Sequence, residues 1–291
     1  MKMVKRALAA SAAFLIGSTP AMAAWSDLNL RVGVTPLSRE IYGLHTLILW
    51  ICVAIAVAVF GVMIYSIATF RKSKGAVPAT FDHSTTAEVV WTLIPVLILV
   101  GMAIPSARTL VHIDDSSGSE LTIKVTGYQW KWQYEYVGQG VSFYSALAQD
   151  SNFARQLDSG VDPATVPNYL LEVDNPLVVP QGVKVRVLVT AADVIHSWWV
   201  PDFGIKKDAI PGYINELWFK ADTAGTYRGQ CVELCGRDHG FMPIVVEVRP
   251  RAEFDAWLEA RKAAAQAANA PSTKVATNSD EPAALHVAAA E

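Results

Sequence analysis

The amino-acid sequence predicts a hairpin of two transmembrane helices followed by an exported, all-β domain. Three observations predict this fold class. Two long uncharged apolar stretches lie in the first part of the chain, a short basic loop separates them, and alternating apolar and polar residues follow. The chain has 291 residues, of which 52% are hydrophobic and 18% charged. This composition allows two membrane spans and a separate core.

Residues 1–23 have the pattern of a secretory signal peptide. A basic start, MKMVKR, precedes the apolar run ALAASAAFLIG and the small residues AMA, which is the order of n-region, h-region and cleavage site. The alternative is a first membrane anchor, but the apolar run is shorter than the ~20 residues that a spanning helix needs. We therefore expect export of the mature chain, with 24–40 as its exported N-terminal segment.

Two transmembrane helices are predicted at 41–70 and 88–110. The stretches 41–70 and 89–107 contain no Asp, Glu, Lys or Arg, and each is long enough to cross a bilayer. The loop between the helices, 71–87, opens with RKSK. Because Lys and Arg are enriched in cytoplasmic loops, we expect this loop inside and both ends of the mature chain on the exported side.

Short β-rich runs fill residues 120–250, among them LTIKVTGYQW, KWQYEYV, NYLLEV, KVRVLVT and PIVVEV. Clusters of Gly, Pro, Asn and Asp bound them, which is typical of a sandwich or barrel. Residues 138–168 are poorly periodic and predict a surface insertion. A helix over 251–270 and a disordered tail over 271–291 complete the expected organisation.

Alternate aromatic residues in YQWKWQYEY share one face of a strand by spacing alone. These residues are Tyr128, Trp130, Trp132, Tyr134 and Tyr136. Packing in the core is the ordinary explanation for such a row of aromatics.

The segment CVELCGRDHGFM gathers residue types that the exported domain otherwise uses sparingly. That domain contains only two cysteines, Cys231 and Cys235, two histidines, His196 and His239, and one methionine, Met242. Four of the five lie in this one loop. His196 directly follows the predicted strand KVRVLVT, so it lies at a strand end where a loop could face the other four.

Thiolate, imidazole and thioether together are the ligands of copper electron-transfer sites. Two cysteines and two histidines suffice for two copper ions if both thiolates bridge them, with Met242 and a backbone carbonyl as weak axial ligands. A Cys231–Cys235 disulfide is the alternative that an exported compartment favours, but it needs neither imidazole nor thioether. A zinc site of two cysteines and two histidines is a second alternative, which leaves Met242 without a role.

The segments DVIHSWWVP, CVELCGRDHGFMP and YQWKWQYEY closely resemble subunit II of the bacterial (aa3-type, CuA-containing) and mitochondrial cytochrome c oxidases. The resemblance covers about residues 40–250 and includes the two-helix anchor. It implies that the β domain is a cupredoxin-like Greek-key barrel holding a dinuclear copper centre, CuA. It also implies a magnesium ion shared with subunit I.

The metal ligands follow from the resemblance by matching position. They would be His196, Cys231, Cys235, His239, Met242 and the backbone carbonyl of Glu233. The Glu233 side chain would point the other way, toward the magnesium. The ordinary explanation for Glu233 is a solvated loop acid.

The activity implied by the resemblance belongs to a complex, because the chain alone would catalyse nothing. Cytochrome c would reduce the copper pair, which would pass electrons to haem in subunit I, where O2 becomes water and protons are pumped. The implied partners are subunits I and III and cytochrome c, with haem only in the partner subunit and no nucleic acid. The implied location is the bacterial inner membrane, with the mature N-terminus and the C-terminal domain in the periplasm.

The resemblance also assigns roles outside the ligand set. Trp130 resembles the tryptophan through which electrons enter in the family. Glu88, at the cytoplasmic end of the second helix, matches the residue at the entrance of the family's proton path. The ordinary explanation for such an acid is that its side chain snorkels to the membrane interface. Asp174, Asp193 and Glu135 would dock the donor. The domain has 15 acidic and 11 basic residues, a balance that favours a basic partner.

Two other functions compete with this interpretation. An exported copper-delivery or thiol–disulfide protein also uses two cysteines four apart and a distant histidine, but it has a thioredoxin-like fold and usually one anchor. A quinol-oxidising relative of the family lacks the copper ligands, and here all of them are present.

Overall fold

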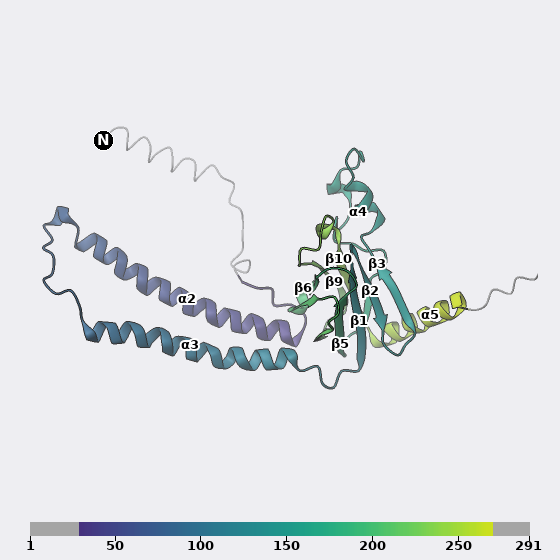
Figure 1. Ribbon diagram of the computed structural model, residues 1–291, viewed down its shortest axis with the longest axis horizontal. Helices are drawn as coiled ribbons and strands as arrows, with labels where there is room; N and C mark the ends of the chain where they lie inside the picture. The colour runs from purple at the N-terminus through teal and green to yellow at the C-terminus, as the bar shows by residue number, and fades with distance from the viewer. Residues whose placement is uncertain (1–28, 270–291) are drawn as a thin grey trace, which may run out of the picture.

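The computed structural model describes residues 29–269, so the expected signal peptide (1–23) and tail (271–291) lie outside the described residues. Helices α2 (Pro36–Thr69) and α3 (Thr85–Asp114) lie side by side, leading from the β domain to a distant turn and back (Figure 1). The β domain follows them. The predicted fold class, a two-helix hairpin followed by an all-β domain, is confirmed.

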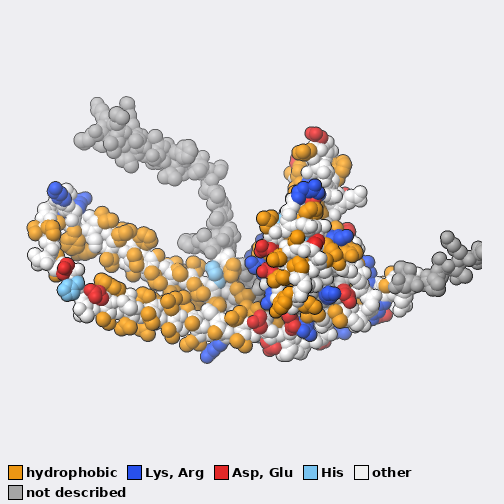
Figure 2. All heavy atoms as spheres, viewed as in Figure 1, with side chains coloured by type: hydrophobic (Ala, Val, Ile, Leu, Met, Phe, Trp, Pro, Cys, Tyr) orange, Lys and Arg blue, Asp and Glu red, His pale blue; other side chains and the backbone are white. Residues whose placement is uncertain are grey.

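Both helices are suited to a membrane. They have 34 and 30 residues, more than the ~20 that cross a bilayer, and the side chains of their most apolar stretches are exposed. Hydrophobic side chains line the pair, and Lys and Arg gather at the far turn (Figure 2). That turn contains the short 3-10 helix η2 (Lys72–Lys74).

Helix α2 begins before the predicted residue 41 because Thr35 caps it. The Thr35 Oγ1 accepts a hydrogen bond from the Ser38 amide at 3.0 Å, and the Ser38 hydroxyl accepts one from the Thr35 amide at 3.1 Å. This reciprocal pair is a capping box, and Pro36 occupies the first turn. The Thr35 hydroxyl also donates to the carbonyl of Phe203 at 2.7 Å, so the helix starts on the surface of the β domain.

The β domain consists of two five-stranded sheets that share one core. Their orders are β3-β2-β1-β5-β8 and β4-β10-β9-β6-β7, with β1–β5 and β4–β10 parallel and the other pairs antiparallel. The strand bounds are β1 Leu121–Tyr128, β2 Lys131–Tyr136, β3 Val141–Ser145, β4 Leu177–Pro180, β5 Lys184–Ala191, β6 His196–Val200, β7 Ile205–Ala209, β8 Asn215–Lys220, β9 Gly225–Cys231 and β10 Pro243–Arg249.

Alternation along the strands builds this core. In β1 and β5 every second residue is buried, as expected when successive side chains point to opposite faces of a sheet. Ile123 and Val125 of one sheet and Val200 and Ile244 of the other have no exposed surface. Helix α5 (Arg251–Asn269) covers one side of the domain and buries Phe254.

The C-terminal end of α3 is also held by the β domain. The Lys184 ammonium donates to the carbonyls of Asp115 and Ser117 at 2.7 and 2.8 Å. The indole of Trp218 donates to the carbonyl of His112 at 3.1 Å. Because unpaired carbonyls remain at every helix C-terminus, these donors join the helical hairpin to the domain.

The predicted insertion over 138–168 needs correction at its start. Residues Val141–Ser145 form strand β3 on the edge of the first sheet, and the departure from the sheet begins only after Ser145. It contains α4 (Gln149–Ala154) and η3 (Pro163–Thr165). The run NYLLEV, predicted as a strand, makes only an isolated bridge to Leu147. The first error arises because Gly-rich and polar flanks conceal a short strand that pairing with β2 stabilises.

The runs LTIKVTGYQW and KWQYEYV form two strands, but the expectation that the alternate aromatics of YQWKWQYEY share one face of a strand is wrong. Strand β1 ends at Tyr128 and β2 begins at Lys131, and these two residues pair across a tight hairpin. The aromatics of β2 are buried as expected, but Trp130 lies in the turn and is only half-buried. The Gln129–Trp130 turn contains no Gly, Asn, Asp or Pro, the residues that mark two-residue hairpins in a sequence.

Candidate metal centre

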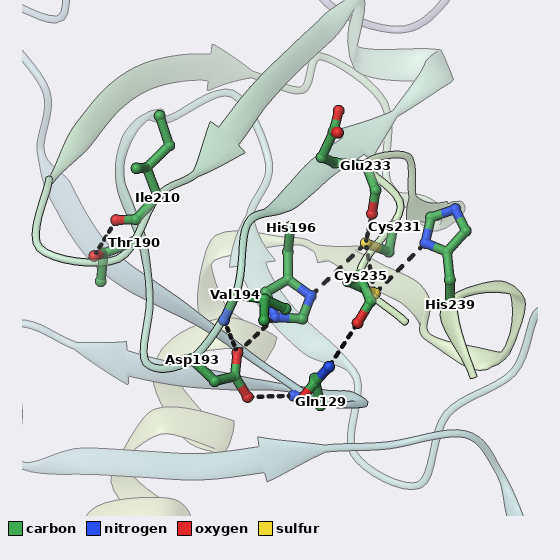
Figure 3. Close-up of polar contacts among 10 residues, drawn as sticks. All are labelled: Gln129, Thr190, Asp193, Val194, His196, Ile210, Cys231, Glu233, Cys235 and His239. Atoms are coloured by element: carbon green, nitrogen blue, oxygen red, sulfur yellow. Dashed lines mark hydrogen bonds and ion pairs between the residues drawn. The ribbon is translucent and has the colours of Figure 1, made fainter. Parts of the chain in front are cut away.

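Neighbouring strands of the second sheet bring the candidate ligands together (Figure 3). His196 is the first residue of β6, and Cys231 is the last residue of β9. Strands β6 and β9 pair through Trp198 and Cys231, so the histidine lies at the start of the cysteine loop. The 3-10 helix η5 (His239–Phe241) ends that loop just before β10.

The two thiols of the loop face each other without forming a disulfide. Their sulfur atoms lie 3.8 Å apart, well beyond the ~2.05 Å of an S–S bond. Both cysteines are free and buried, with 4% of Cys231 and 2% of Cys235 exposed. The pair is therefore enclosed and available to a common ligand.

Each thiol has an imidazole beside it. The Nδ1 of His196 lies 4.0 Å from the Cys231 sulfur, and the Nδ1 of His239 lies 3.5 Å from the Cys235 sulfur. The carbonyl of Glu233 lies 3.5 Å from the Cys231 sulfur. Possible ligand atoms of His196, Cys231 and Cys235 all lie within 4.8 Å of one another. This spacing suits a small metal centre.

Asp193 orients His196. Its Oδ1 lies 2.9 Å from the Nε2 of His196, while its Oδ2 accepts from the Gln129 amide at 2.8 Å. The Gln129 side chain in turn donates to the carbonyl of Cys235 at 2.8 Å. A carboxylate on the far nitrogen of a ligating imidazole fixes its ring and raises its basicity, so Nδ1 is the nitrogen left to face the sulfur atoms.

Gly127 leaves room for the His196 ring. A Cβ at this position would lie 2.7 Å from Cδ2 of His196, so any other residue would displace the imidazole. Sequence reasoning missed both Gly127 and the role of Gln129. The available signal was a glycine inside the alternating strand LTIKVTGY, since strand glycines often mark a close approach.

The electrostatics of the pair favour the loss of one thiol proton. Burial raises the pKa of Cys231, but its contacts with His196 and with backbone amides outweigh burial and lower the pKa to about 7. Burial and the charge of Cys231 raise the pKa of Cys235 to about 12. Burial lowers the pKa of His196, yet Cys231 and Asp193 raise it overall. A metal ion bound by both sulfurs therefore displaces a proton from Cys235 at neutral pH.

Met242 completes the set of soft donors. It is 2% exposed and belongs to the same buried cluster as the two cysteines. Its carbonyl accepts a hydrogen bond from the Cys231 amide at 3.1 Å, which places it directly across from the first cysteine. Two buried thiols with an imidazole beside each, and a buried methionine in the same cluster, fit a soft transition-metal ion.

The other predicted site residues lie outside this pocket. The Glu233 side chain is exposed and points away from the sulfur atoms, although its carbonyl faces Cys231 (Figure 3). Glu88 lies in the first turn of α3, at the far end of the hairpin. Glu135 is exposed on β2, and Asp174 is exposed while accepting from the Ala146 amide at 2.8 Å.

Trp130 packs against the metal-ligand loop. A Cβ at Gly236 would lie 3.2 Å from Cζ2 of Trp130, so the indole rests on the backbone next to Cys235. The guanidinium of Arg237 lies over the same ring, 5.6 Å from its centroid. The structure thus places this tryptophan beside the centre but not among its ligands.

Comparison with known proteins identifies the family. The model of the cytochrome c oxidase subunit II periplasmic domain matches residues 121–249, and that of the transmembrane domain of the same subunit matches residues 23–109. A probable cytochrome c oxidase subunit 2 from Rickettsia bellii is 39% identical over 253 residues, covering 87% of this chain and 90% of the relative. The chain belongs to the cytochrome c oxidase subunit II family.

Two further subunit II proteins are similar to this chain, one over most of its length and one over about half. Cytochrome c oxidase subunit 2 of Cereibacter sphaeroides is 37% identical over 270 residues, covering 86% of this chain and 89% of the relative. The crystal structure of the periplasmic domain of subunit II from Bradyrhizobium japonicum is 47% identical, covering 51% of this chain and 98% of that chain with a TM-score of 0.44.

Membership of the subunit II family confirms the resemblance seen in the sequence. The chain is a subunit of cytochrome c oxidase, a haem–copper terminal oxidase. The structure also argues against a copper-delivery protein. Such a protein is expected to have one anchor and a thioredoxin-like fold, whereas this chain has two long apolar helices and a two-sheet domain.

Proposed function

We propose that this subunit accepts electrons from cytochrome c at a dinuclear copper centre and passes them to haem in subunit I. There O2 is reduced to water and protons are pumped. The observation that carries the proposal is the pair of buried, unbonded thiols 3.8 Å apart with an imidazole beside each. The identities of the electron donor and acceptor rest on the family, and the identity of the metal rests on the chemistry of these side chains.

The copper ligands in this proposal come from one loop and one strand end. They are His196, Cys231, Cys235, His239, Met242 and the carbonyl of Glu233. A bound copper pair would supply one-electron redox chemistry. The protein buries both sulfurs, with Cys231 at the end of β9 and Cys235 in the loop after it. This burial would exclude water and limit the change in ligand geometry when the charge changes. Met242 is of no use to zinc, which favours copper.

Trp130 is proposed to receive the electron from cytochrome c. Its ring rests on the backbone of Gly236, next to the ligand Cys235, which gives a short path from the domain surface to the centre. Asp174 and Glu135, both exposed, are proposed to dock the donor. Asp193 was expected to do the same, and its bond to His196 supports an orienting role in addition.

We also propose roles for Glu233 and Glu88, a third subunit, a signal peptide and a location. The exposed Glu233 carboxylate would face a magnesium ion shared with subunit I, and Glu88 would open a proton path on the cytoplasmic side. Subunit III would complete the complex. The signal peptide would end near residue 23, where the match to the family's transmembrane domain begins. The periplasm of a bacterium, bounded by the inner membrane, would then hold the β domain.

Rapid mixing tests the electron path. Anaerobic oxidase would be mixed with reduced cytochrome c, and the rate at which the copper centre is reduced would be compared between the parent and Trp130→Gln. We expect reduction to slow by about tenfold or more, as for other losses of reaction geometry, with an unchanged copper spectrum. Tyr144→Phe, on the exposed edge strand β3, is the control and should react like the parent. Parent-like kinetics of Trp130→Gln would contradict this path.

A further inference from the structure

The chain segment 146–176 is anchored at its base, although it leaves the first sheet. The Ala148 amide donates to the carbonyl of Glu172 at 3.0 Å, and the Asp174 amide donates to that of Ala146 at 3.1 Å. The Ser151 hydroxyl, 1% exposed, accepts from the Leu170 amide at 3.1 Å. These bonds join the two arms of the segment, and Arg228 of β9 donates to the Glu172 carboxylate at 2.6 Å, which ties the base of the segment that carries α4 to the second sheet (Figure 1).

Arg155, directly after α4, reaches from this anchored segment to the metal-ligand loop. Its Nη1 lies 3.5 Å from Oδ1 of Asp238, and its guanidinium lies 4.3 Å from the centroid of the Phe241 ring. The Asn152 side chain accepts from its Nε at 2.8 Å. Only 21% of the Arg155 and 16% of the Asp238 side chain is exposed, so solvent screens this pair less than a surface pair.

The two residues that Arg155 contacts flank the proposed ligand His239. Between them the chain forms only the short helix η5, held by the Phe241 amide donating to the carbonyl of Asp238 at 2.9 Å. A cavity of about 190 Å³ lies beside this turn, lined in part by Trp130, Asn152 and Asp238. Close packing therefore does not support the turn on that side, and the contacts of Arg155 supply the support instead.

We propose that Arg155 is a positioning residue that holds the His239 turn in its ligand-binding conformation. This assigns a function to the segment 146–176, which fixes one side of the metal-ligand loop from outside the sandwich. The inference rests on the proposed metal centre, because it concerns how one of its ligands is held. It does not depend on Trp130 or on the identity of the electron donor.

Arg237 is a matched control within the same ion-pair cluster. Its Nη2 lies 3.5 Å from Oδ2 of Asp238, the same distance as in the Arg155 pair, but 82% of its side chain is exposed. Arg237 also belongs to the metal-ligand loop itself, so it cannot fix that loop to another element. Loss of Arg237 removes an equal charge from Asp238 and leaves the proposed support in place.

The experiment uses the full chain in the assembled oxidase. Copper retained by the complex would be followed over time in the presence of a copper chelator, and the electron paramagnetic resonance spectrum of the centre would be recorded. We expect Arg155→Gln to lose copper at least about threefold faster than the parent and to alter the copper hyperfine pattern. Arg237→Gln should match the parent in both. Arg155→Lys should restore part of the retention, because it keeps the charge but not the planar stacking on Phe241.

Asp238→Ala provides a second route if Arg155→Gln prevents assembly. The Asp238 side chain caps no backbone amide of η5, so alanine removes only its ion pairs, and the same faster copper loss is expected. Parent-like retention and spectrum in Arg155→Gln, or in Asp238→Ala where the first variant does not assemble, would overturn the positioning role. A parent complex without copper in this subunit would instead overturn the proposed function.

Discussion

Single side chains at the candidate centre have separate tasks of binding, orienting and leaving space. Cys231 and Cys235 supply sulfur, Asp193 fixes the His196 ring, and Gly127 leaves room for that ring. The orienting and spacing residues come from other strands and loops than the cysteines. Substitutions of the ligands and of their supporting residues can therefore separate the loss of a ligand from the loss of its support.

Met242→Leu should remove a ligand without removing the fold. Leucine has a similar volume, and such swaps in a core usually cost less than about 1.5 kcal/mol. We expect near-parent stability of the complex with a shifted reduction potential and electron paramagnetic resonance spectrum of the centre. Met102→Leu in α3 is the control and should change neither. An unaltered spectrum in Met242→Leu would show that the buried thioether is not a ligand.

Asp193→Asn should weaken metal binding through His196. One oxygen of the carboxylate accepts from the Gln129 amide, and the other faces Nε2 of His196. Asparagine has only one oxygen and one NH2 group, so one of these two partners would face a donor instead of an acceptor. Loss of such outer contacts typically costs 10- to 100-fold in metal affinity, and we expect about tenfold in a chelator competition. Asp174→Asn is the control. Equal copper affinity in the two variants would refute the orienting role.

Sequence reasoning identified the residue types of the centre but not their support. Five rare residues in one domain were sufficient to indicate a metal site, because four of them lie within one loop of the sequence. Asp193 was expected on the docking face through family resemblance, yet the structure directs its carboxylate to His196. The two residues are only three apart in the sequence, but the second contact of the carboxylate, with the Gln129 amide, depends on the approach of the β1–β2 turn to the loop after β5, which no local pattern in the sequence encodes.

The elements are arranged so that the membrane hairpin and the β domain form one unit. Thr35 begins α2 on the carbonyl of Phe203, and Lys184 holds two carbonyls just after the end of α3. The prediction of helices and strands succeeded where the sequence signal was long, as in the uncharged apolar run of α2 and the alternation of β5. It failed at β3 and at the Gln129–Trp130 turn, where the deciding interactions are pairs with a neighbouring strand.

Thr35→Ala should loosen the junction of α2 and the β domain. It removes the N-cap and the bond to Phe203 while burying no new polar side chain, and loss of an N-cap costs about 1–2 kcal/mol. We expect a lower thermal midpoint of the complex and faster proteolysis between hairpin and domain. Ser84→Ala is the matched control, because Ser84 caps α3 with a longer, 3.4 Å contact in an exposed position. Equal effects of both substitutions would argue against the junction.

The whole molecule has a clear polarity along its long axis. The β domain with the candidate centre lies at one end, and the basic turn with η2 lies at the other, separated by the two apolar helices (Figure 2). Lys and Arg in short loops favour the cytoplasmic side. The proposed orientation therefore places the metal centre and Glu88 on opposite sides of the membrane.

Cysteine labelling tests this orientation in sealed, right-side-out membrane vesicles. Ser73→Cys lies in η2, and Leu157→Cys lies on the β domain, where Leu157 is 96% exposed. A membrane-impermeant maleimide should label Leu157→Cys at once and Ser73→Cys only after lysis. The parent chain controls for its own cysteines. Immediate labelling of Ser73→Cys in intact vesicles would reverse the proposed topology.

The most direct test of the central claim is electron paramagnetic resonance with metal analysis of the assembled oxidase, followed by mapping of Cys231 and Cys235 by mass spectrometry. We expect two copper ions in this subunit, a spectrum of one unpaired electron shared by both nuclei, and two cysteines that carry free thiols once the metal is removed. A cystine joining these residues in a subunit without copper would contradict it.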